Sequence, residues 1–132
     1  MKILLVTHQF LPDFSGGTEV LTYNTARELT KLGHDVVVFT GYPAKGKTNQ
    51  NQLDYYGYKE IRVVRFRHVT VASNDQDDLG ESEYNNRLSY SLFKNYLLDA
   101  RPDLVHFYHM LRISASAIDA CHDLKVPSIF TA

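Results

Sequence analysis

Two histidines and a tyrosine stand close together in the segment VHFYHMLRIS, residues 105–114. His106 and His109 follow a short apolar run, and Tyr108 lies between them. Imidazole exchanges protons near neutral pH, so either histidine could act on a bound ligand. A hydrogen-bonded structural role at the end of a strand is the alternative, and both interpretations stay open here. Zinc binding is not indicated, because no H-x-x-x-H pair or cysteine pair supplies further ligands.

A second stretch that could do chemistry is LPDFSGGTE, residues 11–19. Its adjacent glycines, Gly16 and Gly17, precede a segment with a helical spacing of apolar residues. The free N–H groups and the positive dipole end of such a helix can hold a phosphate or a carboxylate. Glycines also let a ligand approach the backbone closely, because they lack a Cβ atom. A phosphate-facing loop and a plain glycine turn both fit this stretch.

Familiar nucleotide and calcium motifs do not fit the sequence. A dinucleotide fingerprint requires G-x-G-x-x-G and an acidic residue after the second strand, whereas Thr40 and Gly41 stand where that acid should be. A P-loop needs a lysine after its second glycine, and no lysine occurs between Lys2 and Lys31. The acidic segment 75–86 lacks the calcium ligands expected at its fifth and twelfth positions.

The elements that must position these residues follow from the period of the apolar side chains. Residues 2–7 and 35–40 are short aliphatic runs typical of buried strands. Between them, residues 18–32 have helical spacing and end at Gly33, a natural C-terminal stop. This order predicts a crossover between two parallel strands. The face predicted to be buried on this helix consists of Leu21, Thr25, Ala26, Leu29 and Leu32.

The rest of the chain continues the alternation. Residues 41–58 are polar and rich in glycine and asparagine, which predicts a long loop. Residues 59–71 predict a half-exposed strand, decorated by three arginines and with room for a short partner strand. An acidic loop, a helix, a strand, a helix and a last strand are predicted at residues 72–83, 84–100, 102–107, 114–124 and 126–131. The faces predicted to be buried on these two helices are Tyr84, Leu88, Leu92 and Tyr96, and Ala115, Ile118 and Cys121.

These elements predict an α/β fold, a Rossmann-like parallel sheet with helices on both faces. Ligands of such sheets bind beyond the C-terminal ends of the strands. That rule selects four places: residues 8–17, Gly41, residues 106–112, and Thr131 onward. The glycine pair and the two histidines both fall in these places. Their convergence is better support for a binding site than either stretch alone.

Composition narrows the classes of function. The 132 residues are 44% hydrophobic and 22% charged, the balance of one ordinary globular domain. A formal net charge of −1 offers no field that attracts nucleic acid. The lone cysteine, Cys121, makes no internal disulfide and is expected to be a small core residue. The N-terminal apolar run is too short for a secretory signal or a membrane span, so we expect a cytoplasmic protein, with peripheral membrane contact left open.

The same residues resemble a family pattern. The chain through Gly41 resembles the opening of family-4 retaining glycosyltransferases of the GT-B fold: an apolar strand, F-x-P-x-x-x-G-G-x-E, a helix, and L-x-x-x-G-H-x-V-x-V-x-T. Residues 101–132 resemble that family's P-D-[IVL]-V-H-x-H stretch, followed by V-P-x-[IV]-x-T. The first match is carried by Phe10, Pro12, Gly16, Gly17, Glu19, Leu29, Gly33, His34, Val36, Val38 and Thr40.

The resemblance implies that residues 1–132 are the N-terminal, acceptor-side half of a GT-B enzyme. The implied reaction transfers a sugar, with retention, from a UDP- or GDP-linked donor to a glycan or lipid-linked acceptor, without a metal or another cofactor. Its partner would be its own C-terminal, donor-binding domain, and the chain by itself would be an inactive fragment. The enzyme would work in the cytoplasm, at the inner membrane face if it is peripheral. A non-catalytic phosphate- or sugar-binding Rossmann-like module is the main alternative.

The resemblance also implies roles for particular residues. Gly16 and Gly17 would face the donor's diphosphate and sugar, while His8 and Glu19 would lie on the acceptor side. In the family, the second histidine of H-x-H approaches the donor sugar near the reacting centre.

This sequence departs from that H-x-H pattern. His106 is the first histidine, Tyr108 occupies the second position, and His109 comes directly afterwards. We expect His109 to take the role of the family's catalytic histidine, with Tyr108 as the alternative.

Overall fold

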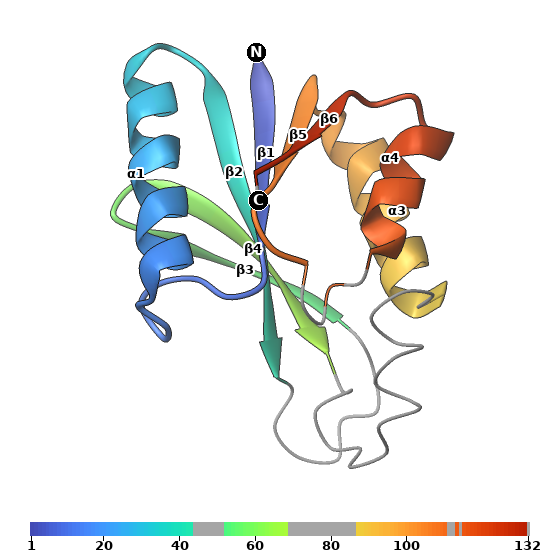
Figure 1. The fold of residues 1–132 in the computed structure, drawn as a ribbon, viewed down its shortest axis with the longest axis horizontal. Helices are drawn as coiled ribbons and strands as arrows, with labels where there is room; N and C mark the ends of the chain where they lie inside the picture. Colours follow the sequence, from blue (N-terminus) through green and yellow to red (C-terminus); the bar gives the residue numbers. More distant parts are fainter. Residues whose placement is uncertain (44–51, 69–86, 111–112, 114, 132) are drawn as a thin grey trace.

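The computed structural model describes residues 1–43, 52–68, 87–110, 113 and 115–131. Within these ranges six strands form one sheet in the order β3-β4-β2-β1-β5-β6 (Figure 1). Every neighbouring pair is parallel except β3 and β4. The strands are β1 (Lys2–Thr7), β2 (Asp35–Pro43), β3 (Gln52–Tyr58), β4 (Ile61–His68), β5 (Leu104–Phe107) and β6 (Ser128–Phe130). The helices are α1 (Gly17–Lys31), α3 (Arg87–Ala100) and α4 (Ser116–Asp123).

The sheet has a core on each face, because the consecutive apolar side chains of its central strand, β1, point alternately to the two faces. Ile3 and Leu5 of β1 pack on the side of α1, and Leu4 and Val6 pack on the side of α3 and α4. Figure 1 shows α1 on one side of the sheet and α3 and α4 on the other. A strand buried on both faces needs such a continuous aliphatic run. The predicted Rossmann-like α/β fold with helices on both faces is therefore confirmed.

Helix α1 begins and ends close to the predicted positions, but its buried face differs from the predicted one. Gly33 follows it with a φ of +94°, a conformation that side chains with a Cβ rarely adopt. Leu21 and Leu32 are 49% and 75% exposed, so their assignment to the buried face was wrong. The residues buried against the sheet are Glu19, Thr22 and Ala26. Thr22 tolerates burial because its hydroxyl donates to the Thr18 carbonyl at 2.7 Å.

The largest error in the predicted elements concerns residues 52–58. They form β3, antiparallel to β4, whereas the sequence predicted a loop. Lys59 and Glu60 join the two strands with φ angles of 44° and 70°. Positive φ at both central residues is the backbone of a tight hairpin turn, which glycine and asparagine usually mark. The strand predicted within residues 59–71 is present as β4, but it is not half-exposed, because Ile61 and Val63 are buried on one face and Val64 and Phe66 on the other.

On the opposite face, α3 is also rotated from the predicted orientation. Its deeply buried residues are Ser89, Phe93 and Leu97, while Leu92 and Tyr96 are only half-buried. Tyr84 and the acidic segment 72–83 lie outside the described residues.

Helix α4 buries small residues against α3 and the sheet. Ala117, Ala120 and Cys121 are buried, whereas Ile118, predicted to be buried, is exposed. Burial raises the pKa of the Cys121 thiol to about 12, which fits the predicted core role. Among the described helices, none combines the length and the apolar character that crossing a bilayer requires.

Candidate active site

The carboxyl ends of the central parallel strands bring the predicted site stretches together. The Tyr108 amide donates to the Val6 carbonyl at 2.8 Å, and the Gly41 amide donates to the His8 carbonyl at 3.2 Å. The Thr131 amide donates to the Phe107 carbonyl at 3.0 Å. Four segments that are remote in sequence are thus joined by backbone hydrogen bonds at one edge of the sheet. Binding in open α/β sheets concentrates at this edge.

His8 and His109 form the accessible part of this edge. Their ring centroids lie 4.2 Å apart with the planes tilted by 38°. His8 follows β1 and is half-buried, while His109 follows β5 and is exposed. The contact therefore links the segment after β5 to the start of the loop that carries the glycine pair. Imidazole at an exposed strand end can donate or accept a hydrogen bond at neutral pH.

His106 and Tyr108 occupy a more enclosed environment beside this pair. Their rings stack at 4.2 Å with an interplanar angle of 25°. The His106 Nε2 atom and the Thr131 hydroxyl oxygen are hydrogen-bonded at 2.6 Å. Burial lowers the pKa of His106, so the ring is neutral near pH 7 and already engaged. This is the structural role that the sequence left open for a histidine at the end of a strand.

Tyr108 belongs to the core on the α1 side. It is 8% exposed and packs in the same cluster as Phe10, Leu11 and Ala26. Burial raises the pKa of its hydroxyl, and a side-chain hydrogen bond with Thr25 opposes that rise. The phenol is therefore protonated at neutral pH and committed to the protein interior.

The glycine pair forms the N-terminus of α1. Gly16 is the N-cap residue, with φ −96° and ψ −176°, and no side chain caps the helix. The Gly16 carbonyl accepts the first helical hydrogen bond, from Val20 at 3.1 Å. Both glycines are exposed. This leaves a helix end whose early N–H groups can face an anionic ligand.

The two glycines differ in the room that a side chain would find. A Cβ atom on Gly16 would lie 2.6 Å from the Oε2 atom of Glu19, so the end of the Glu19 side chain would have to move. A Cβ atom on Gly17 would meet nothing within 4 Å. Because a substitution at Gly17 disturbs no neighbour at the Cβ position, Gly17 is the better probe of an approaching ligand.

Glu19 lies beneath the glycine pair. Its side chain is only 3% exposed, although the resemblance implied an acceptor-side position. It is the third residue of α1, where a glutamate can fold back toward the N-cap. A carboxylate is also favoured near the positive end of the helix dipole. The geometry makes Glu19 a support for the loop.

Two side chains that sequence reasoning missed fasten the loop to the β3–β4 hairpin. The Tyr56 hydroxyl donates to the Leu11 carbonyl at 2.7 Å, and burial raises the pKa of this hydroxyl to about 12. Arg65 binds Asp54 through two hydrogen bonds of 2.9 and 3.0 Å and reaches Asp13 at 3.3 Å. The signal was present in the strand-forming run DYYGY, but the glycine-rich and asparagine-rich surroundings outweighed it.

The arrangement suits an anionic, hydrogen-bonding ligand. It offers backbone N–H groups at Gly17, on a loop that the β3–β4 hairpin tethers, and an exposed imidazole at His109, after β5. Within the described ranges, no three His, Cys, Asp or Glu side chains gather as metal ligands would.

Comparisons with known proteins bear on the family and the fold of the chain. A family model described as Glycosyltransferase Family 4 matches residues 15–132. The fold is similar to the solved catalytic domain of starch synthase IV from Arabidopsis thaliana bound to ADP and acarbose, with a TM-score of 0.61 and 14% sequence identity. The match covers 98% of this chain and 32% of that one, so the chain spans about a third of the length of that structure. No curated protein sequence matches the chain significantly.

Proposed function

Because this chain belongs to Glycosyltransferase Family 4, we propose that it is the N-terminal, acceptor-side domain of an enzyme that transfers a sugar from a nucleotide-sugar donor to an acceptor hydroxyl, with retention. The donor is UDP- or GDP-linked, and the acceptor is a glycan or a lipid-linked sugar. The enzyme works in the cytoplasm and reaches a lipid-linked acceptor at the inner membrane face. A C-terminal domain supplies the other wall of the donor site, so this chain alone turns over no donor.

One observation carries the proposal: the helix N-terminus at Gly16–Gly17 and the exposed His109 are parts of one strand-end edge, joined through the ring contact between His8 and His109. The departing nucleoside diphosphate gains negative charge in the transition state. Backbone N–H groups at a helix N-terminus are fixed donors that stabilise such charge without rearranging. A glycine at position 17 leaves the space that the diphosphate needs.

His109 is the residue we assign to the transferring sugar. Its exposed ring can hydrogen-bond a sugar hydroxyl and hold the reacting carbon beside the acceptor. Tyr108 is unsuited to this role, because its ring is buried and its hydroxyl bonds inside the domain. We assign positioning roles to two other residues. His106 is hydrogen-bonded to Thr131, and the Glu19 carboxylate lies beside Gly16 at the start of α1.

The experiment expresses the complete gene product and measures the release of UDP and GDP from a panel of their sugar conjugates. The anomeric configuration of the product is read by NMR. We expect turnover of one donor class, with the anomeric configuration of the donor kept, and no turnover by residues 1–132 alone.

Two results contradict this proposal. A product with inverted anomeric configuration would show that the transfer is not retaining. Donor or phosphate binding without any turnover, by the complete gene product, would favour the non-catalytic module.

A further inference from the structure

A pocket lies at the other end of the sheet, between α3 and the strands β3 and β4. Its volume is about 440 Å³, within the range of small-molecule sites. It lies on the α3 face of the sheet, where Val37, Val64 and Tyr96 line it. The glycine pair begins α1, which covers the opposite face (Figure 1). The pocket is therefore distinct from the strand-end site.

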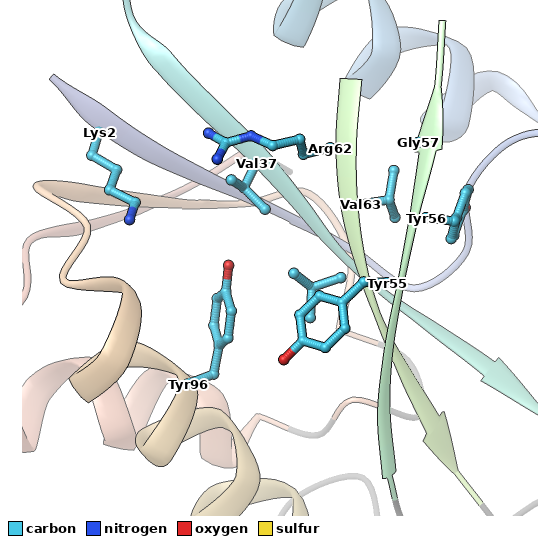
Figure 2. A pocket seen from close by; sticks show the side chains of 9 residues that line it. Lys2, Val37, Tyr55, Tyr56, Gly57, Arg62, Val63 and Tyr96 are labelled. Carbon is cyan, nitrogen blue, oxygen red and sulfur yellow. The ribbon is translucent and has the colours of Figure 1, made fainter. Parts of the chain in front are cut away.

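Two tyrosines form the walls of the pocket. Figure 2 shows Tyr96 rising from α3 and Tyr55 reaching toward it from β3. Tyr55 is 69% exposed, a large fraction for an aromatic side chain. Val37 and Val64 of the buried core contribute to the apolar lining. Ring faces and aliphatic groups thus make up most of the surface that a ligand would touch.

The charged residues that line the pocket are Lys2 and Arg62, and the Tyr96 hydroxyl points toward them (Figure 2). Among the residues that the structure describes, the lining contains no carboxylate. Outside the lining, Asp35 forms an ion pair with Arg62 and offsets its charge. The positive charge that remains is too small to select a polyanion.

We propose that this pocket binds a neutral sugar unit of an extended glycan acceptor, outside the transfer site. A pyranose ring has an apolar C–H face that packs on aromatic rings and a rim of hydroxyls that both donate and accept. Tyrosine walls satisfy the first requirement, and the tyrosine hydroxyls, which donate and accept, satisfy the second together with the donors Lys2 and Arg62. The identity of this ligand rests on the proposed function, because a glycan acceptor is what brings such a chain to the protein.

The two sites would divide the handling of one substrate. The strand-end edge holds the reacting hydroxyl, and the pocket at the opposite edge holds a sugar unit farther along the same chain. Only an acceptor of several sugar units could occupy both places at once. Short acceptors would miss the pocket, so it favours long ones.

The test titrates the protein, without any donor, with three neutral probes: maltoheptaose, cellohexaose and xylohexaose. Binding is followed by calorimetry and by NMR of the tyrosine side chains. We expect at least one probe to bind saturably and to shift the signals of Tyr55 and Tyr96. Tyr55→Ala should weaken that binding at least tenfold. Leu98→Ala removes another exposed side chain, one that does not line the pocket, and this variant should bind as the parent does.

Three results would overturn the proposal: no binding of any neutral probe, equal binding by Tyr55→Ala, or tighter binding of hexagalacturonate than of every neutral probe. None of them depends on turnover. Failure of the transferase proposal would appear in the donor assay of the complete gene product, so the two failures are distinguishable.

Discussion

His106 and His109 are three positions apart and have opposite environments. The His106 ring stacks on Tyr108 and is hydrogen-bonded to Thr131, and burial lowers its pKa. His109 is exposed, and its ring contacts the His8 ring. The sequence could nominate both residues and could not separate them, because burial depends on which element covers each ring. The structure divides them into a structural group and an accessible one.

The first prediction separates His109 from Tyr108 as the residue that acts on the donor sugar. In the complete enzyme, His109→Ala should lower kcat about 100-fold, the usual effect of losing a positioned group of this kind, and leave the thermal midpoint nearly unchanged. Tyr108→Phe should instead lower stability by about 1 kcal/mol, through its lost hydrogen bond, with kcat within a few fold. Steady-state kinetics and thermal unfolding measure both. The reverse pattern would give the role to Tyr108.

The second prediction concerns the pH dependence of stability through His106. Its pKa is lower in the folded protein than its ordinary value of 6.5, so the unfolded chain binds the extra proton first. Above pH 6.5 the ring is neutral in both states, and the folded protein keeps its full stability. As the pH falls below 6.5, protonation of the unfolded chain lowers the free energy of unfolding. Urea unfolding at pH 8.0 and pH 5.5 should show a smaller loss of stability in His106→Gln than in the parent. An equal loss in both would contradict the burial of a neutral ring.

The sequence predicted the order of the helices and strands well, and it predicted poorly which face of each helix is buried. The aliphatic runs at residues 2–7 and 35–40 became β1 and β2, because a run apolar at successive positions can be buried on both sides. The last predicted strand also formed, as β6, although its three residues are exposed. The helix faces were misjudged because the sheet packs closely on α1 through Thr22 and Ala26, while Leu21 remains outside. Hydrophobicity alone does not reveal where a neighbouring element leaves room for a large side chain. Strand β3 was missed for another reason: the turn that follows it, Lys59-Glu60, lacks the glycine that normally marks a tight hairpin.

The third prediction tests the tether between β3 and the glycine loop. Tyr56→Phe removes the hydroxyl that binds the Leu11 carbonyl and keeps the ring that lies under Arg65. We expect about 1 kcal/mol of lost stability and a several-fold higher KM for the donor, with kcat less affected. Tyr58→Phe, on the same strand and the same face, is the matched control. If both variants raise KM equally, the tether has no special role.

The fourth prediction tests the corrected face of α1 against the core of β1. Leu5 is fully buried, so Leu5→Ala should cost about 2–5 kcal/mol. Leu32→Ala should cost less than about 0.5 kcal/mol, as surface substitutions do. Urea denaturation gives both values. A large loss in Leu32→Ala would restore the face that the sequence predicted.

At the scale of the whole molecule, the sheet has two ends with different chemistry. The strand-end edge gathers the glycine loop and the histidines, and the opposite edge holds the tyrosine-walled pocket near Lys2. The sequence predicted the first site because binding at the C-terminal ends of parallel strands follows from topology alone. It could not predict the second, since Tyr55 and Tyr96 come together only through the pairing of β3 with β4 and the packing of α3.

The central claim is that the glycine loop faces the donor's diphosphate, and Gly17→Val tests it most directly. A Cβ atom at this position would meet nothing within 4 Å, unlike one at Gly16, so we expect the fold to be unaffected. Leu21→Ala, on the exposed face of the same helix, is the control. We predict that Gly17→Val lowers kcat/KM for the donor at least 100-fold in the complete enzyme, while its thermal midpoint stays within about 2 °C of the parent, a shift well below what 1 kcal/mol produces in a domain of this size. Unchanged kcat/KM in a folded Gly17→Val enzyme would contradict the account.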